Sequence, residues 1–277
     1  MDVKLIVSDI DHTILPSNQI ISPATYSAVR DCRARGVEFV IASGRWYPAA
    51  RKVAVDQLGI DEGYMIICNG GAVVRSDGTP LAEWRLSGAQ AQQIFDLLKA
   101  EKVMMNAYAP DAIYRVRGEY LTCFRLPETS YFDEGMSYRV VEGDWEGFEE
   151  GIQSGPYKIE AYTDDTALLA ELRRRIEALG YEANSAFPFN LEIMAPGAGK
   201  GTAVRWLTEY MQLTGDQVMG FGDYTNDLPM LENVGWPVAV GNAIDEVKAA
   251  CRIIAPACED DGVAKTISNY VLGDEQP

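Results

Sequence analysis

The chain begins with a short apolar segment that ends abruptly in polar residues. Residues 3–7 are rich in branched side chains, and Ser8 and Asp9 follow them directly. This pattern is typical of a strand that is buried on both faces of a parallel sheet. Asp9 is therefore expected at the carboxyl end of the first strand.

Helix and strand signals alternate in the next part of the chain. A helix is predicted to begin with Ser22 as its N-cap and Pro23 in its first turn, and Gly36 follows its end. The pattern then predicts a strand, a helix and a strand at residues 38–42, 48–58 and 64–68. Strands and helices in alternation imply an α/β fold with a parallel sheet.

The pattern changes after a hairpin predicted at Asp77 and Gly78. Ser87 and Gln90 have the spacing of a capping box, for a helix that reaches about Lys102. The following segments predict strands at 104–108, 112–117 and 157–162, a less regular acidic stretch at 142–150, and a helix at 166–179. This middle part is expected to form a small α+β domain.

Strand and helix alternate again from Leu191 onward, with strands predicted at 217–221, 237–240 and 252–255. The chain is therefore interpreted as one α/β domain interrupted by an insertion. The Rossmann-like core, with its parallel sheet, is expected to comprise residues 1–83 and 191–277. The inserted α+β domain is expected to comprise residues 84–190.

Charge restricts the classes of partner. The 277 residues carry a formal net charge of −17, and the pI is about 4.5. Nucleic-acid binding relies on clustered Lys and Arg, so DNA, RNA and anionic membranes are discounted as partners. An acidic protein that acts on a phosphate ester needs local positive charge, from a metal ion or from a few basic side chains.

The cysteines and the first apolar run bear on location. The five cysteines are scattered without C-x-x-C spacing, at Cys32, Cys68, Cys123, Cys251 and Cys258. They are interpreted as reduced thiols. The apolar run at residues 3–7 contains Lys4 and is too short for a signal sequence or a membrane span. A cytoplasmic protein is expected.

Two acidic motifs follow predicted strands. The segment D-I-D-H-T contains Asp9 and Asp11, and G-D-Y-T-N-D contains Asp223, Asn226 and Asp227. A lone D-x-D is as often a polar loop that caps a strand, and Asp223 alone could be a helix N-cap. Convergence of all four carboxylates at one sheet edge would be unfavourable without a cation among them. The set therefore predicts bound Mg²⁺, which prefers oxygen ligands.

Basic and hydroxyl groups suited to phosphate lie elsewhere in the chain. Ser43 and Gly44 follow the second predicted strand and offer a hydroxyl and a backbone N–H, and Arg45 comes next. On its own, this S-G-R segment is only a turn. Lys200 is placed at the start of a helix, where its ammonium group can offset the charge of a phosphoryl group.

Lys200 also allows a rival interpretation. The segment from Pro196 to Thr202 resembles the phosphate-binding loop of adenylate kinases. That loop requires a glycine where Met194 stands, and residue 201 is Gly where Ser or Thr would hold Mg²⁺. The rival interpretation is therefore disfavoured.

In chain order, D-I-D-H-T, S-G-R, a lysine and G-D-Y-T-N-D resemble the four motifs of the haloacid dehalogenase superfamily of phosphatases. The resemblance spans the whole chain. The large insertion and the segment Ile67-Cys68-Asn69-Gly70-Gly71 resemble the Cof-like sugar-phosphatase subfamily, which has a type-two (IIB) cap. This resemblance implies that the insertion is a cap domain that determines substrate specificity.

The resemblance also implies a role for each motif residue. Asp9 is implied as the nucleophile and Asp11 as the general acid and base. Asp223 is implied as a Mg²⁺ ligand beside Asp9, with Asp11 contributing its backbone carbonyl. Ser43 and Lys200 are implied as phosphate ligands, next to Gly44 and Arg45 as further phosphate or substrate contacts. Asn226 is expected to contact phosphate or the nucleophile, and Asp227 to support Lys200 or the metal indirectly.

The function implied is a Mg²⁺-dependent phosphatase that hydrolyses a small phosphorylated metabolite through an aspartyl-phosphate on Asp9. One alternative is a phosphomutase or phosphotransferase, which would yield an isomer or a transferred phosphate instead of free phosphate. A non-catalytic module that binds a phosphorylated ligand is the alternative from another class.

Two further features are open on sequence alone. His12, the only histidine, stands where glycine is frequent in such enzymes, and it is interpreted as an exposed loop residue rather than a base or a metal ligand. Four residues of the insertion are equally compatible with substrate selection and with ordinary strand packing, namely Tyr108, Tyr114, Arg115 and Arg117.

Overall fold

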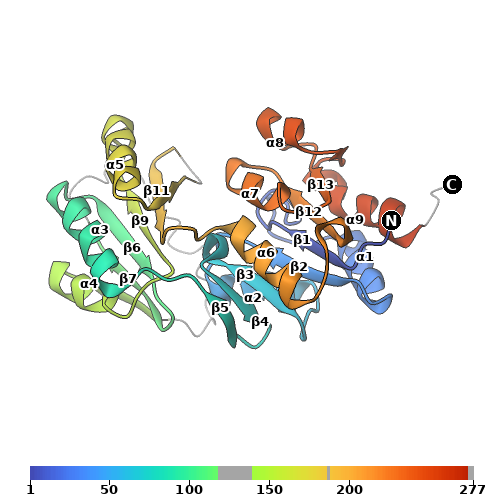
Figure 1. Cartoon of the computed structure of the whole chain (residues 1–277), viewed down its shortest axis with the longest axis horizontal. Helices are drawn as coiled ribbons and strands as arrows, with labels where there is room; N and C mark the ends of the chain where they lie inside the picture. The colour runs from blue at the N-terminus through green and yellow to red at the C-terminus, as the bar shows by residue number, and fades with distance from the viewer. Residues whose placement is uncertain (118–138, 186–187, 274–277) are drawn as a thin grey trace. The chain divides into compact units, whose positions relative to one another are not determined.

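The computed structural model describes residues 1–117, 139–185 and 188–273 (Figure 1). They form two compact units. Unit 1 comprises Met1–Ala82 and Gly199–Pro277, and unit 2 comprises Glu83–Ala198. The chain thus leaves unit 1 once and returns to it once.

Unit 1 contains an eight-stranded sheet. Its strands are β1 (Leu5–Ser8), β2 (Glu38–Ala42), β3 (Tyr64–Ile67), β4 (Ala72–Arg75), β5 (Pro80–Glu83), β12 (Val218–Gly222), β13 (Trp236–Ala239) and β14 (Ile253–Ile254). Their order is β14-β13-β12-β1-β2-β3-β4-β5. The pairs from β14 to β3 are parallel, whereas β3 and β4 are antiparallel. The expected α/β fold is confirmed.

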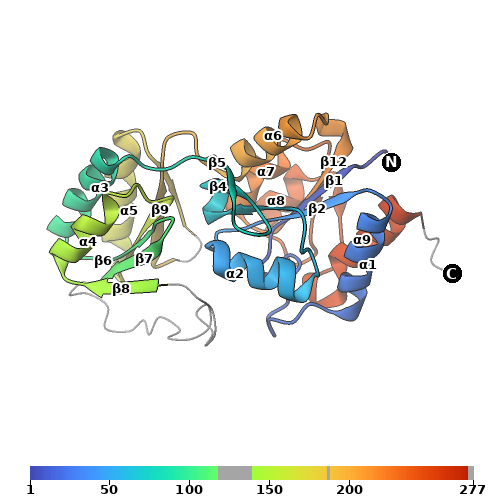
Figure 2. The same ribbon diagram turned by 90° about the horizontal axis from the view of Figure 1, so that it is seen from below.

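Helices cover both faces of this sheet, which buries its apolar strands. The helices are α1 (Pro23–Ala34), α2 (Tyr47–Arg51), α6 (Lys200–Tyr210), α7 (Leu228–Leu231), α8 (Asp245–Ala250) and α9 (Gly262–Ile267). Figure 2 shows α6 and α7 on one side of the sheet, with α1, α2 and α9 on the other. Such strands, covered on both faces, explain the continuous apolar run of residues 3–7.

The first helix begins where local signals predict it. Pro23 occupies its first position, and the Ser22 hydroxyl accepts a hydrogen bond from the backbone N–H of Thr25 at 3.0 Å. This bond satisfies one of the N–H groups that a helix leaves unpaired at its start. The helix therefore runs from the end of β1 back to the start of β2, which keeps these two strands parallel.

Unit 2 contains a six-stranded sheet with helices on one face. The strands are β6 (Met104–Tyr108), β7 (Ala112–Val116), β8 (Arg139–Gly143), β9 (Lys158–Tyr162), β10 (Glu182–Asn184) and β11 (Asn190–Met194), in the order β10-β11-β9-β6-β7-β8. The helices are α3 (Gly88–Ala100), α4 (Trp145–Ile152) and α5 (Thr166–Ala178) (Figure 1). Phe95, Phe148 and Leu172 are buried together with Ala107 and Ile159 of the sheet.

Two predictions are wrong in detail. The acidic stretch at 142–150 was expected to be irregular, but residues 145–152 form α4, which Asp144 caps by accepting a hydrogen bond from Gly147 N at 3.0 Å. The core was expected to resume after residue 190. Strand β11 pairs instead with β9 and β10, so the boundary lies between Ala198 and Gly199.

Four of the five cysteines lie among the described residues. Cys32, Cys68, Cys251 and Cys258 form no disulfide, and Cys123 lies outside the described residues. Among the described residues, no helix has the length and apolar character needed to cross a bilayer.

Candidate active site

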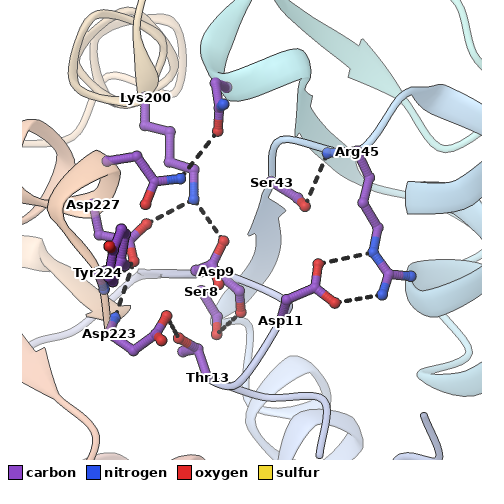
Figure 3. A network of polar contacts seen from close by, with 12 residues as sticks. Ser8, Asp9, Asp11, Thr13, Ser43, Arg45, Lys200, Asp223, Tyr224 and Asp227 are labelled. Atoms are coloured by element: carbon purple, nitrogen blue, oxygen red, sulfur yellow. Dashed lines mark hydrogen bonds and ion pairs between the residues drawn. The ribbon is translucent and has the colours of Figure 1, made fainter. Parts of the chain in front are cut away.

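The two acidic motifs meet at the carboxyl ends of β1 and β12 (Figure 3). The parallel register pairs Ser8 with Phe221, and Asp9 N donates to Phe221 O at 3.0 Å. Parallel pairing brings the residues after each strand to the same sheet edge. Asp9 and Asp223 are therefore neighbours because of strand register.

Lys200 joins this edge from the first residue of α6. Its Nζ lies 2.5 Å from Asp9 Oδ1 and 2.6 Å from Asp227 Oδ1 (Figure 3). The side chains of Lys200 and Asp227 are fully buried, and that of Asp9 is 9% exposed. An ammonium group so deeply buried requires charged partners, and these two carboxylates supply them.

Asp227 holds the loop that follows β12. Its second oxygen, Oδ2, accepts hydrogen bonds from the backbone N–H groups of Asp223 at 2.9 Å and Tyr224 at 3.2 Å. A Cβ atom on Gly222 would lie 2.5 Å from Asp227 Cβ, so only glycine fits there. Both oxygens of Asp227 are thus engaged, which leaves this carboxylate to orient Lys200 and the loop.

Carboxylate oxygens that could hold a cation gather at the same point. Asp9, Asp223 and Asp227 can each offer a carboxylate oxygen within 4.8 Å of the others. Thr13 donates to Asp223 Oδ1 at 3.0 Å and orients it. With Asp227 already engaged, Asp9 and Asp223 are the two carboxylates suited to a hard cation, and this oxygen donor set fits Mg²⁺.

The pKa values of these groups reflect burial and mutual repulsion. Burial raises the pKa of Asp9 well above its ordinary value; Lys200 opposes this, while Asp227 and Asp223 add to it. Burial, with help from Asp227, raises the pKa of Asp223 to about 6. Burial alone would lower the pKa of Lys200, but the charges of Asp227 and Asp9 outweigh it and raise this pKa. Three carboxylates share one ammonium group, so a cation would relieve their repulsion.

Asp11 differs from the expected convergence, because its carboxylate is paired with Arg45 instead. Arg45 Nε donates to Asp11 Oδ2 at 3.0 Å and Nη2 donates to Oδ1 at 2.5 Å (Figure 3). Arg45 Nη2 also donates to Gln19 Oε1 at 2.9 Å. The fork of donors on arginine matches the two oxygens of a carboxylate, so the pair fixes the orientation of Asp11.

Ser43 and Gly44 lie in the turn after β2. Ser43 is buried, and its hydroxyl oxygen accepts a hydrogen bond from Arg45 N at 3.1 Å. Its carbonyl accepts one from Asn69 N at 2.8 Å. The predicted turn is therefore present and is held from the side by the segment after β3.

Asn226, the remaining predicted phosphate contact, lies beside Asn69. Its Nδ2 donates to Asn69 Oδ1 at 3.2 Å. Together with Ser43, Arg45 and Lys200, it belongs to unit 1. Every residue predicted for the site thus lies in one compact unit.

His12 lies at the surface of the loop after β1, as predicted. Its backbone is left-handed, with φ 62°, and its carbonyl accepts a hydrogen bond from Asn242 Nδ2 at 2.7 Å. Left-handed backbone explains why glycine suits this position.

The adenylate kinase interpretation of residues 196–202 gains no support. That loop uses its lysine on nucleotide phosphates, but Lys200 is enclosed between Asp9 and Asp227. The strand before the loop, β11, belongs to the six-stranded sheet rather than to the sheet that positions Asp9.

Of the four residues considered as selectors in unit 2, three lie on strands and divide between the two faces of the sheet, and Arg117 follows the end of β7. Tyr114 packs against α4, where a Cβ atom on Gly151 would meet its ring at 2.2 Å. Arg115 points to the other face and donates to Asn106 Oδ1 at 2.9 Å. Tyr108 donates to Glu160 Oε2 at 2.8 Å, and Arg117 is exposed. Tyr114 therefore serves strand packing.

Thr13 and Asn69 are functional residues of the site that the sequence motifs did not identify. Thr13 is the last residue of the D-I-D-H-T motif, two positions after Asp11. In the structure its hydroxyl donates to Asp223 Oδ1. Asn69 was visible within N-G-G after a strand, a sequence typical of left-handed turns. Neither sequence pattern predicts which residue the side chain of Thr13 or Asn69 contacts.

Comparisons with known proteins agree with this geometry. The model of the haloacid dehalogenase-like hydrolase family matches residues 6–267. The 5-amino-6-(5-phospho-D-ribitylamino)uracil phosphatase YcsE of Bacillus subtilis (strain 168) is 30% identical over 272 residues, which cover 98% of this chain and 97% of that protein. The HMP-PP phosphatase of Yersinia pestis (strain Pestoides F) is 26% identical over 276 residues, covering 97% and 95%.

A solved structure shares the fold. The HAD subclass IIB sugar phosphatase BT4131 superposes with a TM-score of 0.81 at 19% identity, covering 97% of this chain and 99% of that one. At this level of identity the likeness concerns the fold, and it includes both units of the chain.

Proposed function

The chain belongs to the haloacid dehalogenase-like hydrolase family and is a phosphatase of that family, and from this premise we propose that it hydrolyses a small phosphomonoester through an aspartyl-phosphate on Asp9. The family and the enzyme class predicted from the four motifs are thereby confirmed. The relatives' names include a ribityl phosphate compound and HMP-PP. They support a sugar phosphate or a similar small metabolite as the substrate.

One observation carries the proposal, namely the buried contact of Asp9 with Lys200 at the common end of β1 and β12. Lys200 occupies Asp9 Oδ1, and no donor among the described residues contacts Asp9 Oδ2. This second oxygen is suited to attack phosphorus. Lys200 would also offset the charge of an incoming phosphate dianion, which otherwise repels the carboxylate.

The proposed reaction has two steps. In the first, Asp9 Oδ2 forms a bond to phosphorus while the bond from phosphorus to the ester oxygen breaks. Asp11, protonated once Arg45 turns from it to the phosphate, gives its proton to the departing oxygen. In the second, Asp11 takes a proton from water, whose oxygen attacks phosphorus. The bond between Asp9 and phosphorus breaks, which releases inorganic phosphate. Ser43, Gly44, Arg45 and Asn226 are proposed to bind the phosphate oxygens.

Mg²⁺ is the proposed cofactor, with Asp9, Asp223 and the backbone carbonyl of Asp11 as its ligands. When bound, it would neutralise charge that develops on the phosphoryl oxygens. Asp227, whose oxygens are engaged by Lys200 and by the loop N–H groups, is proposed to orient these ligands indirectly.

Unit 2 is proposed to select the substrate, as an inserted cap. The acidic charge of the chain supports a small metabolite rather than a nucleic acid as its partner. Four cysteines of the described residues form no disulfide, and three of them are buried, which supports a cytoplasmic location.

The direct test is a screen of phosphorylated sugars, nucleotides and cofactors for release of inorganic phosphate. Acid-quenched protein is then digested and analysed by mass spectrometry to locate the phosphoryl group. An isomerised product would indicate phosphoryl transfer within the substrate, and binding without turnover would indicate a regulatory module. A phosphoryl group on a residue other than Asp9 contradicts the mechanism.

Metal dependence gives a prediction with a readout independent of turnover. Mg²⁺ at about 100 times its Kd should raise the free energy of unfolding by about 2.7 kcal/mol. Asp223→Ala should abolish this shift while the metal-free protein stays folded, because the change removes a ligand and relieves repulsion. Ca²⁺ should inhibit, since it prefers longer bonds and more ligands. Thermal unfolding with and without each ion measures the shifts, and full activity after exhaustive chelation would contradict the cofactor assignment.

The role of Asp11 predicts a dependence on the leaving group. Asp11→Asn keeps the backbone carbonyl but can neither donate a proton to the ester oxygen nor activate water. An aryl phosphate, whose leaving group needs little protonation, should still phosphorylate Asp9 and give a burst of about one product per enzyme, followed by slow turnover. A sugar phosphate should scarcely react. Rapid-quench kinetics on both substrates measure the difference, and equal losses on the two would remove Asp11 from this role.

A further inference from the structure

The turn between β3 and β4 has an unusual backbone. Cys68 has φ 51° and Asn69 has φ 55°, so two consecutive residues other than glycine are left-handed. Asparagine tolerates this conformation better than most residues, whereas cysteine does not. Such conformations persist only where their surroundings hold them, and they cluster at functional sites.

Contacts hold this turn against three parts of the active site. Asn69 N donates to the carbonyl of Ser43 at 2.8 Å. Gly70 packs on the backbone just before Lys200, since a Cβ atom there would lie 2.2 Å from the carbonyl of Gly199. The turn therefore fixes the spacing between the segment after β2 and the start of α6.

The side chain of Asn69 completes the third contact. It is only 4% exposed, and its Oδ1 accepts a hydrogen bond from Asn226 Nδ2 at 3.2 Å. It also covers Gly44, where an added Cβ atom would lie 3.1 Å from Asn69 Oδ1. One buried amide thus touches two of the proposed phosphate-binding residues.

We propose that Asn69 is a positioning residue for phosphate binding, which holds the amide of Asn226 and the backbone of Gly44 in place. It acts through these two residues and does not itself touch the reacting atoms. The left-handed backbone at residues 68 and 69 is what directs its side chain to them. The inference rests on the proposed function.

Asn69→Gly tests the side chain without disturbing the backbone, because glycine adopts left-handed conformations freely. The variant loses one neutral hydrogen bond to Asn226 and the packing of the side chain on Gly44. This loss should raise both KM and the inhibition constant of inorganic phosphate by about five- to tenfold. The effect falls on KM because substrate and product share the phosphate contacts, so kcat should change less. The melting temperature and the shift caused by Mg²⁺ should remain those of the wild type.

Cys68→Ala is the matched control, because it alters the neighbouring residue of the same turn and leaves the contact with Asn226 intact. Its KM should equal that of the wild type. Asn69→Ser, which keeps a shorter polar side chain, should show a smaller rise than Asn69→Gly and gives a second measurement if the glycine variant folds poorly.

A double-mutant cycle with Asn226→Ala decides whether Asn69 acts through Asn226. The double variant should bind inorganic phosphate about as weakly as Asn226→Ala alone, because the shared contact is lost only once. Fully additive losses, or an Asn69→Gly variant with wild-type KM, would overturn the proposal. Absence of turnover of every phosphomonoester by the wild type would instead overturn the proposed function.

Discussion

An Asp9→Asn variant is expected to lose turnover by at least about 10⁴-fold, because it removes the proposed nucleophile while keeping the shape of the side chain. Neither neighbouring carboxylate of the described site can substitute for it with the same geometry. Asp223 is turned towards Thr13, and both oxygens of Asp227 are engaged. The loss should therefore be the same for aryl and sugar phosphates, unlike that of Asp11→Asn.

The same variant should stay folded. Burial raises the pKa of Asp9, so its ionised form is disfavoured in the metal-free protein. The folded state then binds more protons than the unfolded one above the ordinary pKa of aspartate, and Asp9 lowers stability as pH rises towards neutral. A neutral asparagine removes this cost. Metal-free Asp9→Asn should unfold at the wild-type temperature or above it at pH 7.

Three measurements check this prediction, namely initial rates, thermal unfolding in a chelator, and mass spectrometry of acid-quenched protein. The exposed Asp61→Asn is the control for loss of one negative charge, and it should keep wild-type rates. A phosphorylated protein from Asp9→Asn, or a loss smaller than about tenfold, would show that the nucleophile is another residue.

A Lys200→Met variant is expected to lose both stability and activity. Its ammonium group is the buried partner of Asp9 and Asp227. Removing it leaves two carboxylates buried without that charge, which should lower the free energy of unfolding by about 3–5 kcal/mol at neutral pH. Loss of the charge that faces phosphate should lower kcat/KM by on the order of 10²- to 10³-fold even in folded protein.

Lys158→Met separates the two effects, because unit 2 contains a closely similar buried lysine. Lys158 Nζ lies 2.6 Å from Glu160 Oε1 and 3.2 Å from Glu192 Oε1, and its side chain is 2% exposed. Lys158→Met should lower the free energy of unfolding by a comparable amount, because it too leaves two buried carboxylates without their positive partner. With p-nitrophenyl phosphate, rates measured well below the melting temperature should fall for Lys200→Met and far less for Lys158→Met. Equal loss in both variants would reduce Lys200 to a structural role.

Elements whose signals are local were predictable from the sequence. The start of α1 and the capping box of α3 follow from side chains that bind N–H groups three residues away, at Ser22, Ser87 and Gln90. The same holds for Asp9 and Asp223, because each directly follows an apolar strand and strand ends of a parallel sheet share an edge. The short helix α4 was not predicted, although Trp145, Phe148 and Ile152 have helical spacing. A segment of eight residues with several acidic side chains is too short to show a clear helical period of apolar residues.

The amino-acid sequence by itself thus determined the α/β class, the family, most of the order of the elements and the motif residues that follow the strands. Only the tertiary structure decided which partner each of them takes. Strand β11 joins the sheet of unit 2 because its backbone pairs with β9, and an apolar run alone does not name a partner. Lys200 meets Asp9 across 191 positions of the chain, and Arg45 takes the carboxylate of Asp11 rather than leaving it among the other acids. These choices depend on distances set by packing between distant segments, which no local pattern of residues contains.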